Sequence, residues 1–447
     1  MLFSRRDLVA IVFPLMVEQF LSVLIGMADS MMVASVGEAA VSGVSLVDSL
    51  NLLMVYVFSA LATGGAVVCS QFLGKRDFDA AQNAAKQLVY TTTFVSLLIM
   101  AIAIVFRTPL LNLVFGSIEA DVMANAKIYF LYTAISYPFL AIYSCGAAIF
   151  RAMGNSKISM RASILMNLIN VAGNAILIYI FHLGAAGAAI ATLFSRIIGA
   201  ILMMWLVKNK NNPIYIENFF SFKPNFAIIK RILGVGIPSG VENGIFQLGK
   251  LLTQSLISTF GTAAIAANAA ASALTALQYI PATAIGLAMI TIIGRCVGAG
   301  EKKQAKHYTL VLCMIGYAVI IPVSLIMTIF AKPLIGLYNL SASSSAIAYK
   351  LMVYHAICVS IIYPFSFPLG HTFRAANDVK YPLVVSISCM WIFRVGLSYV
   401  LGGFFNMGIM GVWIAMTCDW LARSVLNIIH FTRGKWLDKY KAMEKTA

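Results

Sequence analysis

Long apolar stretches, separated by short polar segments, run along almost the whole chain. Windows of about 19 residues predict helical spans near residues 8–34, 44–68, 88–106, 128–149, 160–180, 185–207, 234–258, 265–293, 308–330, 350–369, 382–401 and 407–430. Each stretch is close to the ~20 residues that a helix needs to cross the hydrocarbon core of a bilayer. Because the apolar runs are continuous rather than alternating, they favour helices over the strands of a membrane barrel. The pattern therefore predicts an all-α integral membrane protein with twelve transmembrane helices.

The composition agrees with this class and argues against a soluble protein. Of the 447 residues, 61% are hydrophobic and 11% are charged, and the mean hydropathy is +0.89, whereas soluble chains carry roughly 25% charged residues. A net charge of +16 would be typical of a nucleic-acid-binding module, but here the basic residues lie between apolar segments. We therefore expect the lipid bilayer as a partner and no nucleic acid.

The lysines and arginines are distributed unevenly between the two sides of the predicted membrane. If the N-terminus is cytoplasmic, 24 of the 32 face the cytoplasm, four face the other side and four fall within spans. Cytoplasmic loops carry the excess of basic residues. The first apolar stretch, after Arg5 and Arg6, has no cleavage-site pattern, so we expect it to be retained. The sequence predicts a multi-pass protein of the cytoplasmic (inner or plasma) membrane with both termini cytoplasmic.

The two halves of the chain resemble each other at a constant shift of 224 residues. The aligned pairs include Pro14 and Pro238, Glu18 and Glu242, and Gly37 and Gly261, and after one deleted residue Arg151 and Arg374. Each copy contains an even number of spans, so both insert in the same orientation. The repeat predicts two parallel six-helix lobes, residues 1–223 and 224–447, around a central cleft suited to alternating access.

Acidic residues inside apolar spans are expensive and are therefore functional candidates. Asp29 lies eleven residues after Glu18, which brings the two to within about 20° on one helical face. Protonation of Asp29 would change the charge of a low-dielectric cleft by one unit, as a proton-coupled switch requires. We expect Asp48, near the start of the second span, to be solvated at the outer surface. Glu242 follows Pro238 by one turn, where it could cap the broken helix, and Lys250 is a candidate ion-pair partner.

Three amides recur on one face of the fifth span, at Asn167, Asn170 and Asn174. Amide side chains in lipid need partners, water or ions. The stripe is therefore a candidate for binding partner side chains, water or ions. We find no phosphate-binding glycine loop and no metal-binding spacing of histidines and cysteines, so we expect no enzymatic activity and no cofactor apart from a coupling ion.

Several motifs resemble the multidrug and toxic compound extrusion (MATE) transporters over residues 8–430. They are Asp29–Gly37, Gln71–Gly74, Phe150–Lys157, Gly236–Asn243 and the run Ala264–Gly300. The resemblance implies a secondary active antiporter that exports amphipathic, often cationic organic compounds, as in multidrug, xenobiotic or metabolite efflux. The exchanged ion would be H⁺ or Na⁺, the substrates small molecules and the functional unit a monomer. The alternative is a flippase for a lipid or a lipid-linked glycan.

The resemblance also implies a cation-coupling site at Asp29 in which the amide stripe, with Asn170 and Asn174, takes part. Thr192 and Tyr129 match polar positions of the family near that acid, and Asn174 stands where one branch usually has an aspartate. A second proton-binding carboxylate is therefore expected to be absent from this cavity, although amide oxygens could still bind Na⁺ near Asp29. Another branch carries an acid in the tenth span, and its absence here argues against sodium coupling in the second lobe.

Overall fold

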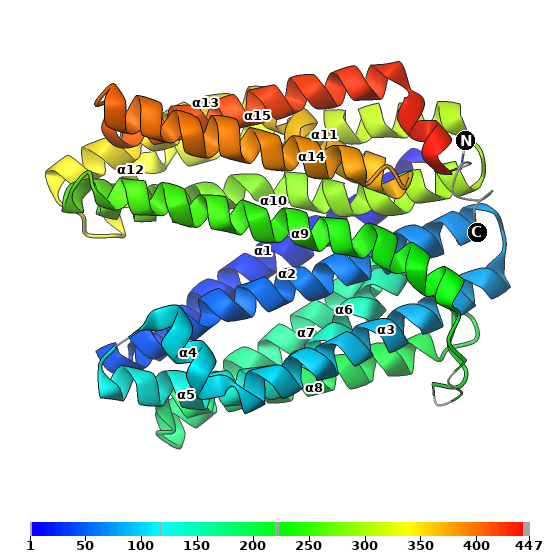
Figure 1. Cartoon of the computed structure of the whole chain (residues 1–447), viewed down its shortest axis with the longest axis horizontal. Coiled ribbons are helices and arrows are strands. Elements are labelled where there is room, and N and C mark those ends of the chain that lie inside the picture. Colours follow the sequence, from blue (N-terminus) through cyan, green and yellow to red (C-terminus); the bar gives the residue numbers. More distant parts are fainter. Residues whose placement is uncertain (1, 117, 220, 222, 441–447) are drawn as a thin grey trace. The chain divides into compact units, whose positions relative to one another are not determined.

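The computed structural model describes residues 2–116, 118–219, 221 and 223–440, and this part of the chain is almost entirely helical (Figure 1). The first half contains α1 (Arg5–Ala34), α2 (Glu38–Gly74), α3 (Phe78–Val105), α4 (Arg107–Phe115), α5 (Ala120–Ile135), α6 (Tyr137–Ala152), α7 (Ser156–Ala175) and α8 (Gly184–Val207). The second contains α9 (Phe226–Ser258), α10 (Thr262–Gly298), α11 (Lys302–Ile329), α12 (Ala331–Gly336), α13 (Ala342–Ala375), α14 (Lys380–Cys389) and α15 (Gly408–Arg433). The π-helical segment η1 (Ile176–Ile180) extends α7, and η2 (Met390–Gly396) and η3 (Tyr399–Phe404) extend α14, while the 3-10 segment η4 (Lys435–Asp438) follows α15.

All twelve predicted spans coincide with helices. Among the described residues, ten helices are long and apolar enough to cross a membrane, and α5 with α6, bent by 45°, make an eleventh. α9 coincides with the seventh predicted span and has 33 residues, but polar side chains such as Glu242, Asn243 and Gln247 interrupt its apolar run. The all-helical membrane fold predicted from the sequence is therefore confirmed.

Equivalent positions of the two halves share local geometry. Gly37 precedes α2 with φ +138°, and Gly261 precedes α10 with φ +92°. Side chains rarely adopt this left-handed backbone, so glycine is required at both turns. Further along, Pro109 and Pro333 lie in the first turns of the short helices α4 and α12, where proline is tolerated. The sequence repeat thus corresponds to a repeated order of helices and turns.

The described chain divides into two compact units, and the division lies inside α9. One unit is Arg5–Gly240, and the other contains Val241 onward together with the segment before Arg5. The first part of α9 packs closely on α2, since a Cβ added at Gly64 would lie 2.3 Å from the carbonyl oxygen of Ile232. The lobe boundary predicted at residue 223 precedes this division and stays a prediction.

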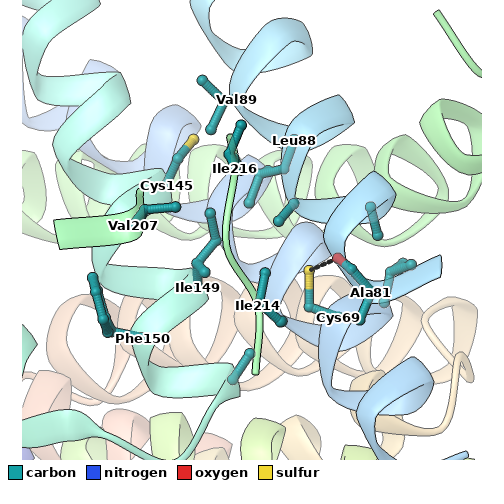
Figure 2. Packing of buried hydrophobic residues seen from close by; sticks show 14 of the residues in the cluster. Cys69, Ala81, Leu88, Val89, Cys145, Ile149, Phe150, Val207, Ile214 and Ile216 are labelled. Atoms are coloured by element: carbon teal, nitrogen blue, oxygen red, sulfur yellow. Dashed lines mark hydrogen bonds between the residues drawn. The ribbon is translucent and has the colours of Figure 1, made fainter. Parts of the chain in front are cut away.

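The polar linker after α8 is packed into the core of the first unit (Figure 2). Ile214 and Ile216 are 0% and 2% exposed, and in Figure 2 their extended segment passes between side chains of α3 and α6, including Leu88 and Ile149. The backbone is also fixed, because the amide of Ile216 donates to the carbonyl of Val207 at 3.1 Å. Two buried isoleucines therefore make this linker part of a hydrophobic core.

Candidate functional site

A cavity of about 290 Å³ lies within the first unit, between α1, α2, α5, α6, α7 and α8. The residues that the sequence assigned to cation coupling, Asp29, Tyr129, Asn170, Asn174 and Thr192, all line it, together with Asn167. The stripe in α7 explains much of this arrangement, because residues three and seven positions apart share a helix face. One helix therefore presents three amides to the cavity that the carboxylate of α1 also lines.

The carboxylate of Asp29 is the centre of a hydrogen-bond network. The side-chain nitrogen of Asn174 donates to Asp29 Oδ1 at 2.8 Å. Asn170, with its amide nitrogen turned toward Asp29, donates to Oδ1 and Oδ2 at 3.0 and 2.9 Å and accepts from the Thr192 hydroxyl at 3.1 Å. The opposite amide orientation would set an oxygen against the carboxylate. The network joins α1, α7 and α8 through one ionisable group.

One polar atom in this network has no partner. The side-chain oxygen of Asn174 is buried and accepts no hydrogen bond, although its nitrogen is used by Asp29. A buried acceptor without a partner costs free energy, about 1–3 kcal/mol. The described residues contain no group of three or more histidine, cysteine or carboxylate side chains that could hold a metal ion. A cation at Asp29 would therefore draw its other ligands from amide and hydroxyl oxygens.

Asp48 is a second carboxylate in the same cavity, where the sequence led us to expect no second proton-binding carboxylate. Asp48 is exposed, and its carboxylate accepts hydrogen bonds from Tyr129 at 3.0 Å and Asn51 at 3.2 Å. Tyr129 therefore contacts Asp48 rather than Asp29. The sequence could not reveal this pairing, because Tyr129 and Asp48 are 81 residues apart on different helices.

Arg196 also lines the cavity, and sequence analysis gave it no role beyond its place in a span. Its guanidinium donates to the hydroxyl of Ser136 at 2.6 Å. Ser136 lies between α5 and α6, where that helix pair bends by 45°. The signal that could have found Arg196 was its charge, because a cation within an apolar span is a functional candidate in the same way as an acid.

Glu18 lies outside this cavity in spite of its helical register with Asp29. Its side chain is 6% exposed, accepts from the Ser159 hydroxyl at 2.9 Å and lies 3.6 Å from Arg151. The guanidinium and the hydroxyl both contact the carboxylate and hold it in place. Glu18 therefore joins α1 to α6 and α7, whereas Asp29 faces the cavity.

Glu242 and Lys250 belong to the second unit. Glu242 pairs with Arg374 at 2.5 Å and accepts from the Ser386 hydroxyl. Within the described residues no salt bridge joins it to Lys250, which instead lies over the ring of Phe246 at 5.1 Å. Cation–π contact of this kind holds an ammonium group against an aromatic face. Glu242 and Lys250 therefore have different partners, Arg374 and Phe246.

A family model for MatE matches the chain twice, at residues 14–176 and 238–400. The chain belongs to the MatE family of transporters. Both ends of the second match lie 224 residues after those of the first, the shift found by comparing the sequence with itself. The resemblance to MATE transporters predicted from the motifs is confirmed.

Curated members of the family cover nearly the whole chain. An uncharacterized transporter, YisQ of Bacillus subtilis, is 28% identical over 97% of this chain and 95% of its own length. A probable multidrug resistance protein, NorM of Thermotoga maritima, is 25% identical over 97% of this chain and 93% of its own length. The cavity therefore lies in a multi-pass membrane transporter.

Solved MATE structures have the same fold. A crystal structure of MATE in complex with MaL6 aligns with a TM-score of 0.90 at 20% identity, covering 98% of this chain and 97% of that chain. The outward-facing structure of a multidrug resistance MATE family transporter aligns with a TM-score of 0.87 at 21% identity, covering 98% and 96%. At this level of identity the likeness concerns the arrangement of the helices.

Proposed function

We propose that this MatE protein is a secondary active antiporter that exports amphipathic, often cationic organic compounds in exchange for H⁺ or Na⁺. The observation that carries the proposal is the setting of Asp29, an ionisable group in a cavity, with hydrogen-bond donors from α7 and a buried amide oxygen without a partner. Several relatives are named probable multidrug resistance proteins, which supports export of foreign compounds. No observation favours the alternative of a lipid or glycan flippase.

Asp29 is the coupling carboxylate in this proposal. A proton or a sodium ion neutralises it, and Asn170, Asn174 and Thr192 respond because their hydrogen bonds end on the carboxylate or next to it. A bound ion shifts the balance between two conformations only as far as it binds one more tightly than the other. The amine of a substrate competes for the same negative charge, so export of the substrate is exchanged for entry of the ion.

The proposal includes a cellular setting. The protein works as a monomer in the cytoplasmic membrane, with both termini in the cytoplasm and no resident cofactor. The distribution of basic residues between the loops supports this orientation. In that orientation the exported compound leaves the cytoplasm while the coupling ion follows its gradient inward.

Transport by the purified full chain in proteoliposomes tests the proposal. A pH gradient and a sodium gradient are imposed separately, and the movement of a fluorescent organic cation is followed for the native chain and for Asp29→Asn. The variant keeps nearly the same shape but cannot change its charge, so gradient-driven transport should fall to the level of empty liposomes. Asp121→Asn is the matched control, because Asp121 is exposed in the first turn of α5.

Two results would contradict the proposal. Transport by well-folded Asp29→Asn that still follows the gradient would remove Asp29 from the coupling step. Native protein that moves the dye under neither gradient would remove antiport itself. The gradient that drives the native chain identifies the coupling ion.

A further inference from the structure

Arg196 brings a positive charge into a cavity whose other charged residues are acids. It lies in α8, in the wall formed with Asp29 and Asp48. A guanidinium has five N–H donors in a planar fork. Among the described residues, Arg196 makes one hydrogen bond, from Nη1 to the Ser136 hydroxyl. Most N–H groups of the guanidinium therefore have no hydrogen-bond acceptor among the described residues.

No carboxylate of the described residues forms a salt bridge with Arg196 within 4.0 Å. Asp48, which lines the same cavity, is held by Tyr129 and Asn51 instead. The other intramembrane arginines differ in this respect, since Arg394 and Arg423 both pair with Asp419. A guanidinium in a span without a carboxylate is costly unless something else supplies negative charge.

We propose that Arg196 binds an anionic group of the substrate, so that the cavity selects zwitterions, compounds that carry a carboxylate as well as an amine. This inference rests on the proposed function, because it names the substrate class of the same cavity. The carboxylate of the solute forms a forked pair with the guanidinium. Its amine is turned toward Asp29 and Asp48, where it competes with the coupling ion.

The rest of the cavity suits a small molecule with an apolar body between its charges. The volume of about 290 Å³ equals roughly ten water molecules at about 30 Å³ each. Val33, Val44, Leu140 and Met166 supply apolar wall beside the polar groups. Methionine adapts its shape to different ligands. A compact aromatic amino acid or an aminomethyl benzoate matches this combination.

A purely structural role is the alternative. Arg196 contacts Ser136 at the bend between α5 and α6, so it could simply hold that bend. The two roles differ in what a substitution changes. Loss of a structural contact weakens the binding of every ligand by a similar factor, whereas loss of an anion-binding group affects only ligands that carry the anion.

Calorimetric binding to the purified full chain in nanodiscs separates the roles. The probes are 4-(aminomethyl)benzoic acid, a zwitterion, and its methyl ester, which has the same amine and ring but no carboxylate. The native chain should bind the acid about tenfold or more tightly than the ester, as expected for a charge-assisted pair. In Arg196→Gln the acid should bind only as tightly as the ester. Arg161→Gln, an exposed arginine of α7, should keep the native preference.

Arg196→Lys serves as a second variant, and it also carries the test if Arg196→Gln does not fold. It keeps the charge but not the fork, so its preference for the acid should be intermediate. Equal binding of acid and ester by the native chain, no binding of the acid, or an unchanged preference in both Arg196 variants would overturn the proposal. Equal weakening of both probes would assign Arg196 a structural role.

The test is separate from that of the proposed function. Equilibrium binding needs no gradient, so a preference for the acid that depends on Arg196 would stand even if neither gradient drives transport. Conversely, gradient-driven transport without a preference for the acid would support antiport and contradict the selection of zwitterions. Asp29→Asn should weaken the binding of both probes by the same factor, because both carry the amine.

Discussion

The carboxylate of Glu18 lies 3.6 Å from the guanidinium of Arg151, in a buried ion pair between α1 and α6. The same relationship recurs in the second half, where Glu242 of α9 pairs with Arg374 of α13. In both halves the glutamate comes four residues after an intrahelical proline. The repeat thus conserves the ion pair that joins the first helix of each half to another helix, in addition to the order of the helices.

The first prediction concerns Glu242. Glu242→Gln leaves Arg374 without its carboxylate at a site where the two side chains are 12% and 10% exposed. Breaking a buried pair costs about 3–5 kcal/mol, so we expect a lower unfolding temperature and weaker efflux. Thermal unfolding in detergent and dye efflux from cells measure the two effects. Glu119→Gln, at an exposed position before α5, is the control.

The double variant Glu242→Gln with Arg374→Gln extends this prediction. Removing both charges should recover part of the stability lost in Glu242→Gln, because the cost comes mainly from the charge left behind. A single Glu242→Gln variant as stable and active as Glu119→Gln would show that the ion pair contributes nothing.

The second prediction concerns Tyr129, whose hydroxyl donates to Asp48 at 3.0 Å. Tyr129→Phe removes this donor while Asn51 still donates to the carboxylate. A hydrogen bond to a charged group contributes about 1.5–3 kcal/mol, so we expect the free energy of unfolding to fall by roughly that amount. Tyr179→Phe, at a residue 49% exposed, should leave stability unchanged, and equal unfolding curves for the two variants would contradict the role of Tyr129.

The third prediction concerns the linker. Ile216→Ala removes a side chain that is 2% exposed in the core of the first unit. Truncation of a buried isoleucine costs about 2–5 kcal/mol. We therefore expect a lower unfolding temperature and faster proteolysis of the segment after α8. Ile201→Ala, at a position 64% exposed in α8, is the matched truncation, and a linker that is equally resistant in both variants would rule out this docking.

The fourth prediction concerns orientation in the membrane. An impermeant thiol reagent applied to intact cells should label Lys332→Cys but not Lys157→Cys, because the loops of the two residues are predicted on opposite sides. Both lysines are exposed, so accessibility does not bias the comparison. Of the native cysteines, Cys358 and Cys418 are the half-buried ones, and a cysteine-free background removes their signal. Labelling of Lys157→Cys alone would reverse the orientation.

The sequence predicted those parts of the structure that depend on local pattern. The positions of the spans follow from apolar run length, and the amides of α7 share a face because of helical period. Asp29 was found by charge and by resemblance to the family. The contact between Tyr129 and Asp48 depends on how α5 packs against α2, and no local pattern encodes that register. Arg196 carried a signal in its charge, but its place in the cavity wall depends on how α8 packs against the neighbouring helices.

The docked linker has a consequence for how the protein is made. The core of the first unit includes Ile214 and Ile216, and also Ile228 and Ile232 from the start of α9. These side chains leave the ribosome only after all eight earlier helices have been synthesised, and domains generally fold as units during synthesis. The core of the first half is therefore complete only after the start of the second half has been synthesised. A chain released at residue 223 would contain one copy of the duplicated sequence but would lack the α9 isoleucines that finish its interior.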